Sequence, residues 1–230
     1  MSAELPLSPA PGFVEDRVRA ELPGLRLSWI TAPAGAARRA SPPALVGRLR
    51  SLSNRYRGAQ VVAMRTQAIP QAYRAFFRQI GLDPDVRRIP SEGAAVQRLL
   101  HGGFRSVDLI TDARLLALLE TGVAVWALDA DHVDVGGLGI RAVTAADRER
   151  GEGLGGYVEP GALVVADARA MHALLFTEPD PAHRVSPRTA RAALFAVAVE
   201  GVPDIHVEEA LWMCAEVLAE SLPDRGTEPG

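Results

Sequence analysis

The spacing of apolar residues predicts helices mainly in the first half of the chain. Apolar side chains recur at helical intervals in several stretches that a serine, a proline or a glycine begins or ends. The first predicted helix starts at a Ser41 cap with two prolines in its first turn. Further helices are expected over 71–80, 93–101 with Ser91 as its N-cap, and 107–119, and a closing amphipathic helix over 205–222. The short run 60–64 is predicted as a buried strand.

Alternating or short apolar runs predict strands mainly in the second half. The expected strands are 25–31, 123–128, 139–143, 162–166, 171–177 and 192–199. The apolar run 192–199 fits either a strand or a helix, and its Val-Ala-Val-Glu ending before Gly201 favours a strand. Because helices and strands are segregated along the chain, we expect an α+β fold. We assign one domain to 12–222, a loose segment to 1–11 and a disordered tail to 223–230.

Composition limits the class of partner and cofactor. The net charge of −3 and the pI near 6.0 give no general attraction to nucleic acid, so DNA is not expected and RNA would need a local basic patch. The start of the chain lacks the features of a signal peptide, and no apolar run is long enough to span a bilayer. We therefore expect a cytoplasmic protein without a membrane partner.

Cysteine and acidic residues offer no metal site by spacing. The single cysteine, Cys214, rules out an intrachain disulfide and is expected to be a buried, unreactive thiol. No cysteine and histidine cluster has zinc spacing. The acidic run 129–134 lacks the glycine placement of a calcium loop. We expect no metal and no cofactor.

Two aspartates are the candidates for catalysis. Asp108 and Asp112 stand one turn apart on a predicted helix, so both carboxylates would share a face and could orient a water molecule. A structural role has equal weight, in which Asp112 forms an ion pair with Arg114 or Arg141.

Basic residues around a predicted helix are candidates for substrate binding. Arg88 and Arg98 flank the helix that Ser91 would cap, and all three are candidates for substrate binding because the N-terminus of a helix favours phosphate. The alternative is a solvated surface on which these arginines pair with Asp83 or Asp85.

Three more residues complete the candidate binding set. Trp126 would stack on a base or an adenosine ring, although core packing is the commoner fate of one tryptophan on a strand. Arg141 lies on an otherwise apolar strand and is the basic residue most readily placed in a pocket. Arg114 is added because of the resemblance described next.

A series of short motifs runs in order from Tyr73 to Gly201. The motifs are Gly81-x-Asp83-Pro84, Arg88-x-Pro90-Ser91, Arg98 with Gly102-Gly103, Val107-Asp108 with Asp112, Ala127-Leu128-Asp129-x-Asp131, Gly137-Leu-Gly-Ile-Arg141, Gly161-x-Leu-Val-Val-x-Asp167 and Thr189. This series resembles a stand-alone B3/B4 domain, the module that edits mischarged tRNA in the β chain of bacterial phenylalanyl-tRNA synthetase. Each motif is short, and it is their order that carries the resemblance.

The resemblance implies a fold built around a β-sandwich-like core flanked by helices. It also implies a pocket that admits the aminoacylated end of tRNA and lets water hydrolyse the ester. Such a reaction needs a positioned water and a polarised carbonyl but no protein nucleophile.

The chain departs from the family pattern at its polar positions. Arg114 and Leu115 stand where the family has a Thr-Asn pair, Trp126 stands where it has a histidine, and a glutamate position falls near Phe195. From the resemblance we expect a free-standing aminoacyl-tRNA deacylase or tRNA-related domain, with tRNA or aminoacyl-tRNA as partner. The departures from the family pattern favour the alternative, a non-catalytic module that binds tRNA ends, an amino acid or another small molecule. A small-molecule enzyme that reuses the fold is a third reading.

Overall fold

The computed structural model describes residues 8–149, 154 and 158–221. The predicted disordered tail, residues 1–7 of the predicted loose start and most of the glycine-rich loop after residue 149 lie outside the described residues. Within them the chain is α+β, as expected, with two four-stranded sheets and eight α-helices. None of these helices has the length and apolar content needed to cross a bilayer.

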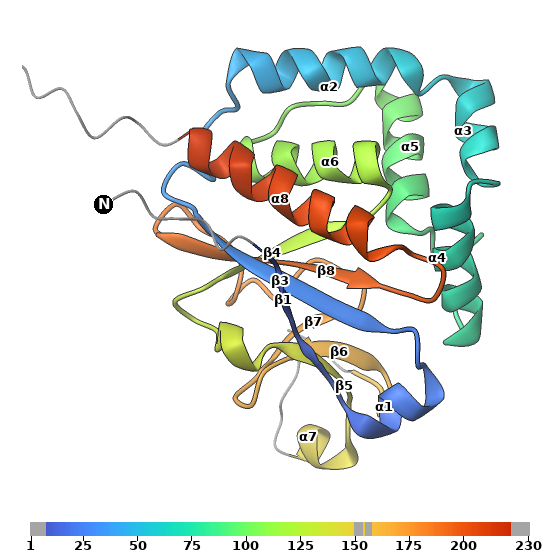
Figure 1. Cartoon of the computed structure of the whole chain (residues 1–230), viewed down its shortest axis with the longest axis vertical. Helices are drawn as coiled ribbons and strands as arrows, with labels where there is room; N and C mark the ends of the chain where they lie inside the picture. Colours follow the sequence, from blue (N-terminus) through green and yellow to red (C-terminus); the bar gives the residue numbers. More distant parts are fainter. Residues whose placement is uncertain (1–7, 150–153, 155–157, 222–230) are drawn as a thin grey trace, which may run out of the picture.

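The first sheet, here sheet A, forms the middle layer of the molecule (Figure 1). Its strands are antiparallel and lie in the order β1 (Ala10–Pro11), β3 (Arg26–Pro33), β8 (Arg191–Ala198) and β4 (Val125–Asp129). Every residue of β8 after Arg191 is buried, because helices cover one face of sheet A and the second sheet lies on the other. Since β1 pairs with β3, the last two residues of the predicted loose start are held in a sheet.

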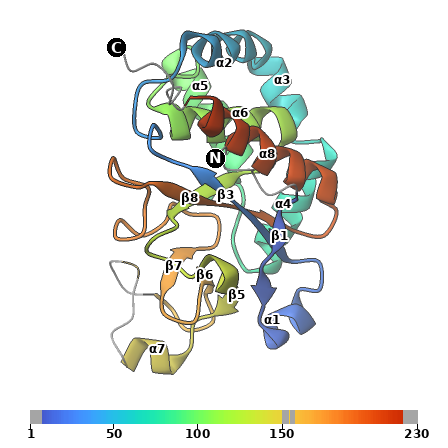
Figure 2. The same ribbon diagram turned by 60° about the vertical axis from the view of Figure 1, so that its left-hand side comes forward.

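The second sheet, here sheet B, lies on the side of sheet A opposite the helices (Figure 2). Its order is β2 (Phe13–Val14), β5 (Gly139–Ala142), β6 (Leu163–Ala166) and β7 (Met171–Leu174), with β2 parallel to β5 and the other pairs antiparallel. A Cβ atom at Gly139 would lie 2.2 Å from the ring of Phe13, so only glycine lets β2 approach β5 this closely. Short helices lie at its margins: α1 (Asp16–Glu21), η1 (Val135–Gly137) and α7 (Ala145–Glu149).

Helices on the other side of sheet A are α2 (Pro43–Arg55), α3 (Gly58–Met64), α5 (Pro90–His101), α6 (Leu109–Thr121) and α8 (Asp204–Glu220), and α4 (Ala68–Gln79) runs beside the end of this sheet. Helix α8 packs on β3, β8 and α6. The hydroxyl of Tyr73 on α4 donates a hydrogen bond of 2.8 Å to the carbonyl oxygen of Val197 on β8, which ties the helical layer to the central strand. One hydrophobic core joins these helices to both sheets.

The structure corrects three predicted local features. Residues 60–64 belong to helix α3, and Val62 is 69% exposed. The strand prediction is wrong because the four apolar residues after Gln60 carry too little periodicity to separate a strand from a helix. Ser41 and Ser91 are not N-caps. Helices α2 and α5 begin at Pro43 and at Pro90, since proline fits the first helical position, and the preceding residue makes no side-chain cap.

The remaining predictions of secondary structure are confirmed with small shifts of boundary. The ambiguous 192–199 segment is strand β8. The predicted strand 171–177 ends at Leu174, where a turn begins. Cys214 is buried in α8, and its burial raises the pKa of the thiol to about 12, so it is unreactive as expected.

A buried histidine and aspartate lie within sheet B and the loop before β7. Nε2 of His172 lies 3.1 Å from Oδ2 of Asp167, and both side chains are buried. Burial lowers the pKa of His172 below its ordinary value, although Asp167 opposes this shift. Burial would raise the pKa of Asp167, but hydrogen bonds from the N–H groups of Asp134, Arg169 and Ala170 lower it.

We predict that the protein loses stability as pH falls from 7 to 5, and that His172→Leu removes part of this loss. The unfolded chain protonates His172 near pH 6.5, whereas the folded chain protonates it only at lower pH, so acid favours unfolding by up to about 1.4 kcal/mol per pH unit. Asp167 does not contribute to this slope, because the stability that its lowered pKa provides is lost only below pH 3.8, outside the range from pH 7 to 5. Urea unfolding at pH 7, 6 and 5 measures the slope.

The control is His101→Gln, which changes a histidine at the exposed end of α5 and shows how far the slope responds to the loss of a histidine elsewhere in the chain. An equal pH slope in wild type and His172→Leu would show that His172 is not responsible.

Candidate functional site

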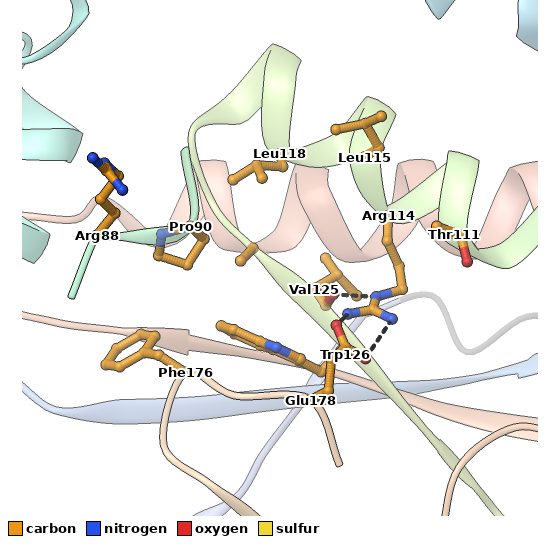
Figure 3. Close-up of a pocket in the computed structure, with 11 residues that line it drawn as sticks. Arg88, Pro90, Thr111, Arg114, Leu115, Leu118, Val125, Trp126, Phe176 and Glu178 are labelled. Atoms are coloured by element: carbon orange, nitrogen blue, oxygen red, sulfur yellow. Dashed lines mark hydrogen bonds and ion pairs between the residues drawn. The ribbon is translucent and has the colours of Figure 1, made fainter. Parts of the chain in front are cut away.

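A cavity of about 320 Å³ opens where α6, β4 and the segment after β7 meet (Figure 3). We call it the α6–β4 cavity. Two parts of the chain that are distant in sequence supply its walls, α6 with the following β4 and the segment after β7, and the start of α5 forms its edge. The lining residues are Arg88, Pro90, Thr111, Arg114, Leu115, Leu118, Ala124, Val125, Trp126, Phe176 and Glu178.

Helix α6 presents one face to the cavity. Thr111, Arg114, Leu115 and Leu118 follow the i, i+3, i+4, i+7 spacing that places side chains on one side of a helix. The other faces of α6 carry buried residues such as Leu116 that pack in the core. This wall is therefore held in place by the packing behind it.

The polar end of the cavity contains an ion pair. The guanidinium of Arg114 contacts both carboxylate oxygens of Glu178, at 2.6 and 3.2 Å, while its Nε donates to the carbonyl oxygen of Val125 at 2.7 Å. Burial would raise the pKa of Glu178, but the hydrogen bonds from Arg114 hold it below its ordinary value. The Glu178 side chain is 56% exposed, so a ligand can still reach its carboxylate.

The opposite end of the cavity is aromatic. Figure 3 shows Trp126 and Phe176 side by side at the end away from Arg114. Their ring centroids are 5.8 Å apart in an edge-to-face arrangement, and behind them Trp126 stacks on Phe195 at 5.8 Å. Only 5% of Trp126 is exposed, so the residue belongs to the core and lines the cavity at the same time.

Arg88 lies at the rim of the cavity, just before α5. Its side chain is exposed and makes no hydrogen bond or ion pair with any of the described residues. Asp85, its expected partner, instead pairs with Arg65 and Arg74. The guanidinium is therefore available to an anionic ligand.

The two candidate catalytic aspartates do not line the cavity. Asp108 is the N-cap of α6, where it accepts from the N–H of Thr111 and lies 2.7 Å from Arg38. Asp112 is fully buried and accepts hydrogen bonds from Ser41 Oγ at 2.6 Å, Ser106 Oγ at 2.5 Å and the N–H of Val107 at 3.0 Å. These partners differ from the predicted arginines and occupy both carboxylates.

The other predicted binding residues lie apart from the cavity. Arg141 is on sheet B and forms an ion pair with Asp147 at 2.7 Å. Burial would raise the pKa of Asp147, but hydrogen bonds from Arg141 and Thr144 lower it strongly. Arg98 lies far along α5 from its N-terminus and donates to the carbonyl oxygen of Ser53.

Ser91 lines a second cavity, of about 350 Å³, on the helical side of the molecule. Leu118 lines both cavities, so one helix separates them. Of the eight predicted site residues, the structure thus gathers Arg88, Arg114 and Trp126 in one place.

Sequence reasoning missed Phe176 and Glu178. Both lie just after β7 in a segment predicted partly as strand and partly as loop, with no motif to mark them. Only the pairing of β7 with β6 and the turn that follows bring this segment against Trp126 and Arg114.

No group of three or more histidine, cysteine, aspartate or glutamate side chains among the described residues has the arrangement of a metal site. The lining of the α6–β4 cavity offers hydrogen-bond donors, one ion pair and aromatic surface. No protein-family model matches the chain, and no curated protein matches it.

We predict that Asp112→Ala lowers the free energy of unfolding by about 3 kcal/mol, because it leaves buried donors without an acceptor. Asp108→Ala should cost less, about 1 kcal/mol, since it removes a helix cap and a partly exposed ion pair. Urea unfolding of both variants at pH 7 tests the order. Equal unfolding midpoints for Asp112→Ala and wild type would show that the three hydrogen bonds do not anchor this carboxylate.

Proposed function

We propose that the chain is a relative of the B3/B4 tRNA-editing module and that its α6–β4 cavity binds the aminoacylated 3′ end of an RNA. One observation carries this proposal. The positions at which the resemblance places the family's polar groups are Arg114, Leu115, Trp126 and Phe195, and these come from three separate elements. The first three line one cavity, and Phe195 stacks directly behind Trp126.

The two ends of the cavity match the two ends of an aminoacyl group. An apolar side chain fits between Trp126 and the leucines of α6, where burial of apolar surface favours binding. A free α-ammonium group can donate to the carboxylate of Glu178, which keeps acceptor sites besides those used by Arg114. Arg88 at the rim can pair with a terminal phosphate.

The architecture also supports the proposal. Two four-stranded sheets, one on each side of a shared core and with helices on the outer face of sheet A, are what the β-sandwich-like core of the resembled module requires. The net charge of −3 favours recognition of a terminus over tracking along an RNA backbone, because extended phosphate contact needs many cations.

Binding without turnover is the function that the geometry supports best. Where the resemblance places the family's polar groups, the cavity is lined by Leu115, Trp126 and Arg114, and the guanidinium of Arg114 is in an ion pair with Glu178. Hydrolysis is the second candidate, and one observation favours it. Thr111 and Arg114 share the polar end, and their O–H and N–H donors could polarise an ester carbonyl.

We predict that Arg88→Ala weakens binding of a short RNA that carries an amide-linked amino acid at its 3′ ribose. Loss of one phosphate contact should raise the Kd about tenfold and reduce the slope of log K against log salt by about 1. Isothermal titration at several salt concentrations measures both values.

The matched control is Arg87→Ala, which removes the same charge from the neighbouring residue, one that lies against a different cavity. An equal loss of RNA affinity in the two variants would indicate that Arg88 acts only through its charge and not through a specific phosphate contact. Absence of binding by the wild type would contradict the proposal.

An assay of aminoacyl-tRNA deacylation at catalytic protein concentration separates the two candidates. Binding without release of the amino acid supports the binding module. Release that falls at least tenfold in Thr111→Val, with the Kd unchanged, would instead support hydrolysis.

A further inference from the structure

Phe176 occupies a backbone conformation that disfavours a bulky residue. It has a φ of 60°, the only positive φ among the described residues other than glycine. It follows β7 in a turn in which the N–H of Thr177 donates to the carbonyl oxygen of Leu174. Phe176 is the third residue of this turn, a position with positive φ at which glycine is preferred. The chain thus carries a phenylalanine where local geometry favours glycine.

The contacts of the ring explain part of this choice. One side of Phe176 packs against three aromatic residues of α4, with centroid distances of 5.7 Å to Tyr73, 5.8 Å to Phe76 and 5.2 Å to Phe77. The other side meets Trp126 and lines the α6–β4 cavity. The ring is therefore clamped by the helical layer and forms a fixed wall of the cavity.

The same turn fixes the distance between the two ends of the cavity. Glu178 lies two residues after Phe176 and is held by the two terminal nitrogens of the Arg114 guanidinium. A ligand whose amino group contacts Glu178 therefore meets the Phe176 ring at a set distance. Backbone conformations of this kind persist where the surroundings over-determine them, and they cluster at ligand sites.

We propose that Phe176 is the specificity-determining residue of the α6–β4 cavity, and that its ring limits the ligand to an apolar group of one ring or less. This inference deepens the proposed function and rests on it only for the identity of the ligand. At about 320 Å³ the cavity is at the small end of the range for ligand sites, so the loss of one wall changes what fits.

The experiment uses neutral probes that carry no amino group, ribose or phosphate. Binding of toluene and of 1-methylnaphthalene to the full chain is measured by ligand-observed NMR. Wild type should bind toluene at least tenfold more tightly than 1-methylnaphthalene. Phe176→Gly, which suits the turn and removes the ring, should shift this ratio at least tenfold toward the larger probe.

Two further variants guard against loss of folding. Phe176→Leu keeps apolar bulk against α4 and should shift the ratio in the same direction by a smaller factor. Phe104→Leu is the matched control, because Phe104 packs against Tyr56 and does not line the cavity, and its ratio should equal that of wild type. Thermal melting of each variant identifies those that are folded.

The outcomes for the probes and for the aminoacyl RNA are separable. A shifted probe ratio without RNA binding supports the role of Phe176 and contradicts the proposed function. RNA binding with an unchanged probe ratio in a folded Phe176 variant overturns the role of Phe176 alone. A wild type that shows no size preference, or that binds neither probe, also overturns it.

Discussion

Burial of strand β8 on both faces is the constraint on which the rest of the structure depends. A strand covered by helices on one side and by a second sheet on the other must be apolar throughout, and 192–198 is. The strand pairs with β3 along eight residues and with β4 along five, so it sets the register of sheet A. Its small alanine side chains let α8 come close, while Phe195 stacks on Trp126.

The α6–β4 cavity follows from this arrangement. Helix α6 covers β4, the strand at the edge of sheet A. The face of α6 that lines the cavity points away from β8 and is not filled by packing against that strand. The turn after β7 reaches across from sheet B and supplies Phe176 and Glu178. The site is thus built from a rigid helix, a rigid strand and one short turn, so its shape depends most on the turn.

The sequence predicted the elements better than the contacts between them. Helical periodicity located α6, whereas the central strand is apolar throughout and was separated from a helix only by its Val-Ala-Val-Glu ending before Gly201. Periodicity does not locate the first residue of a helix, so Ser41 and Ser91 were wrongly predicted as N-caps. The helices begin at Pro43 and Pro90. Asp112 looked catalytic because its burial depends on Ser41 and Ser106, which no spacing rule connects to it. Glu178 was invisible because its partner lies 64 residues away.

The position of Leu118 links the volumes of two cavities. Its side chain borders both the α6–β4 cavity and the neighbouring cavity beside Ser91. A larger residue here would narrow two spaces at once, and a smaller one would widen both. Mutations at this single position therefore cannot change the volume of one cavity independently of the other, whereas Phe176 lines the α6–β4 cavity and not the cavity beside Ser91.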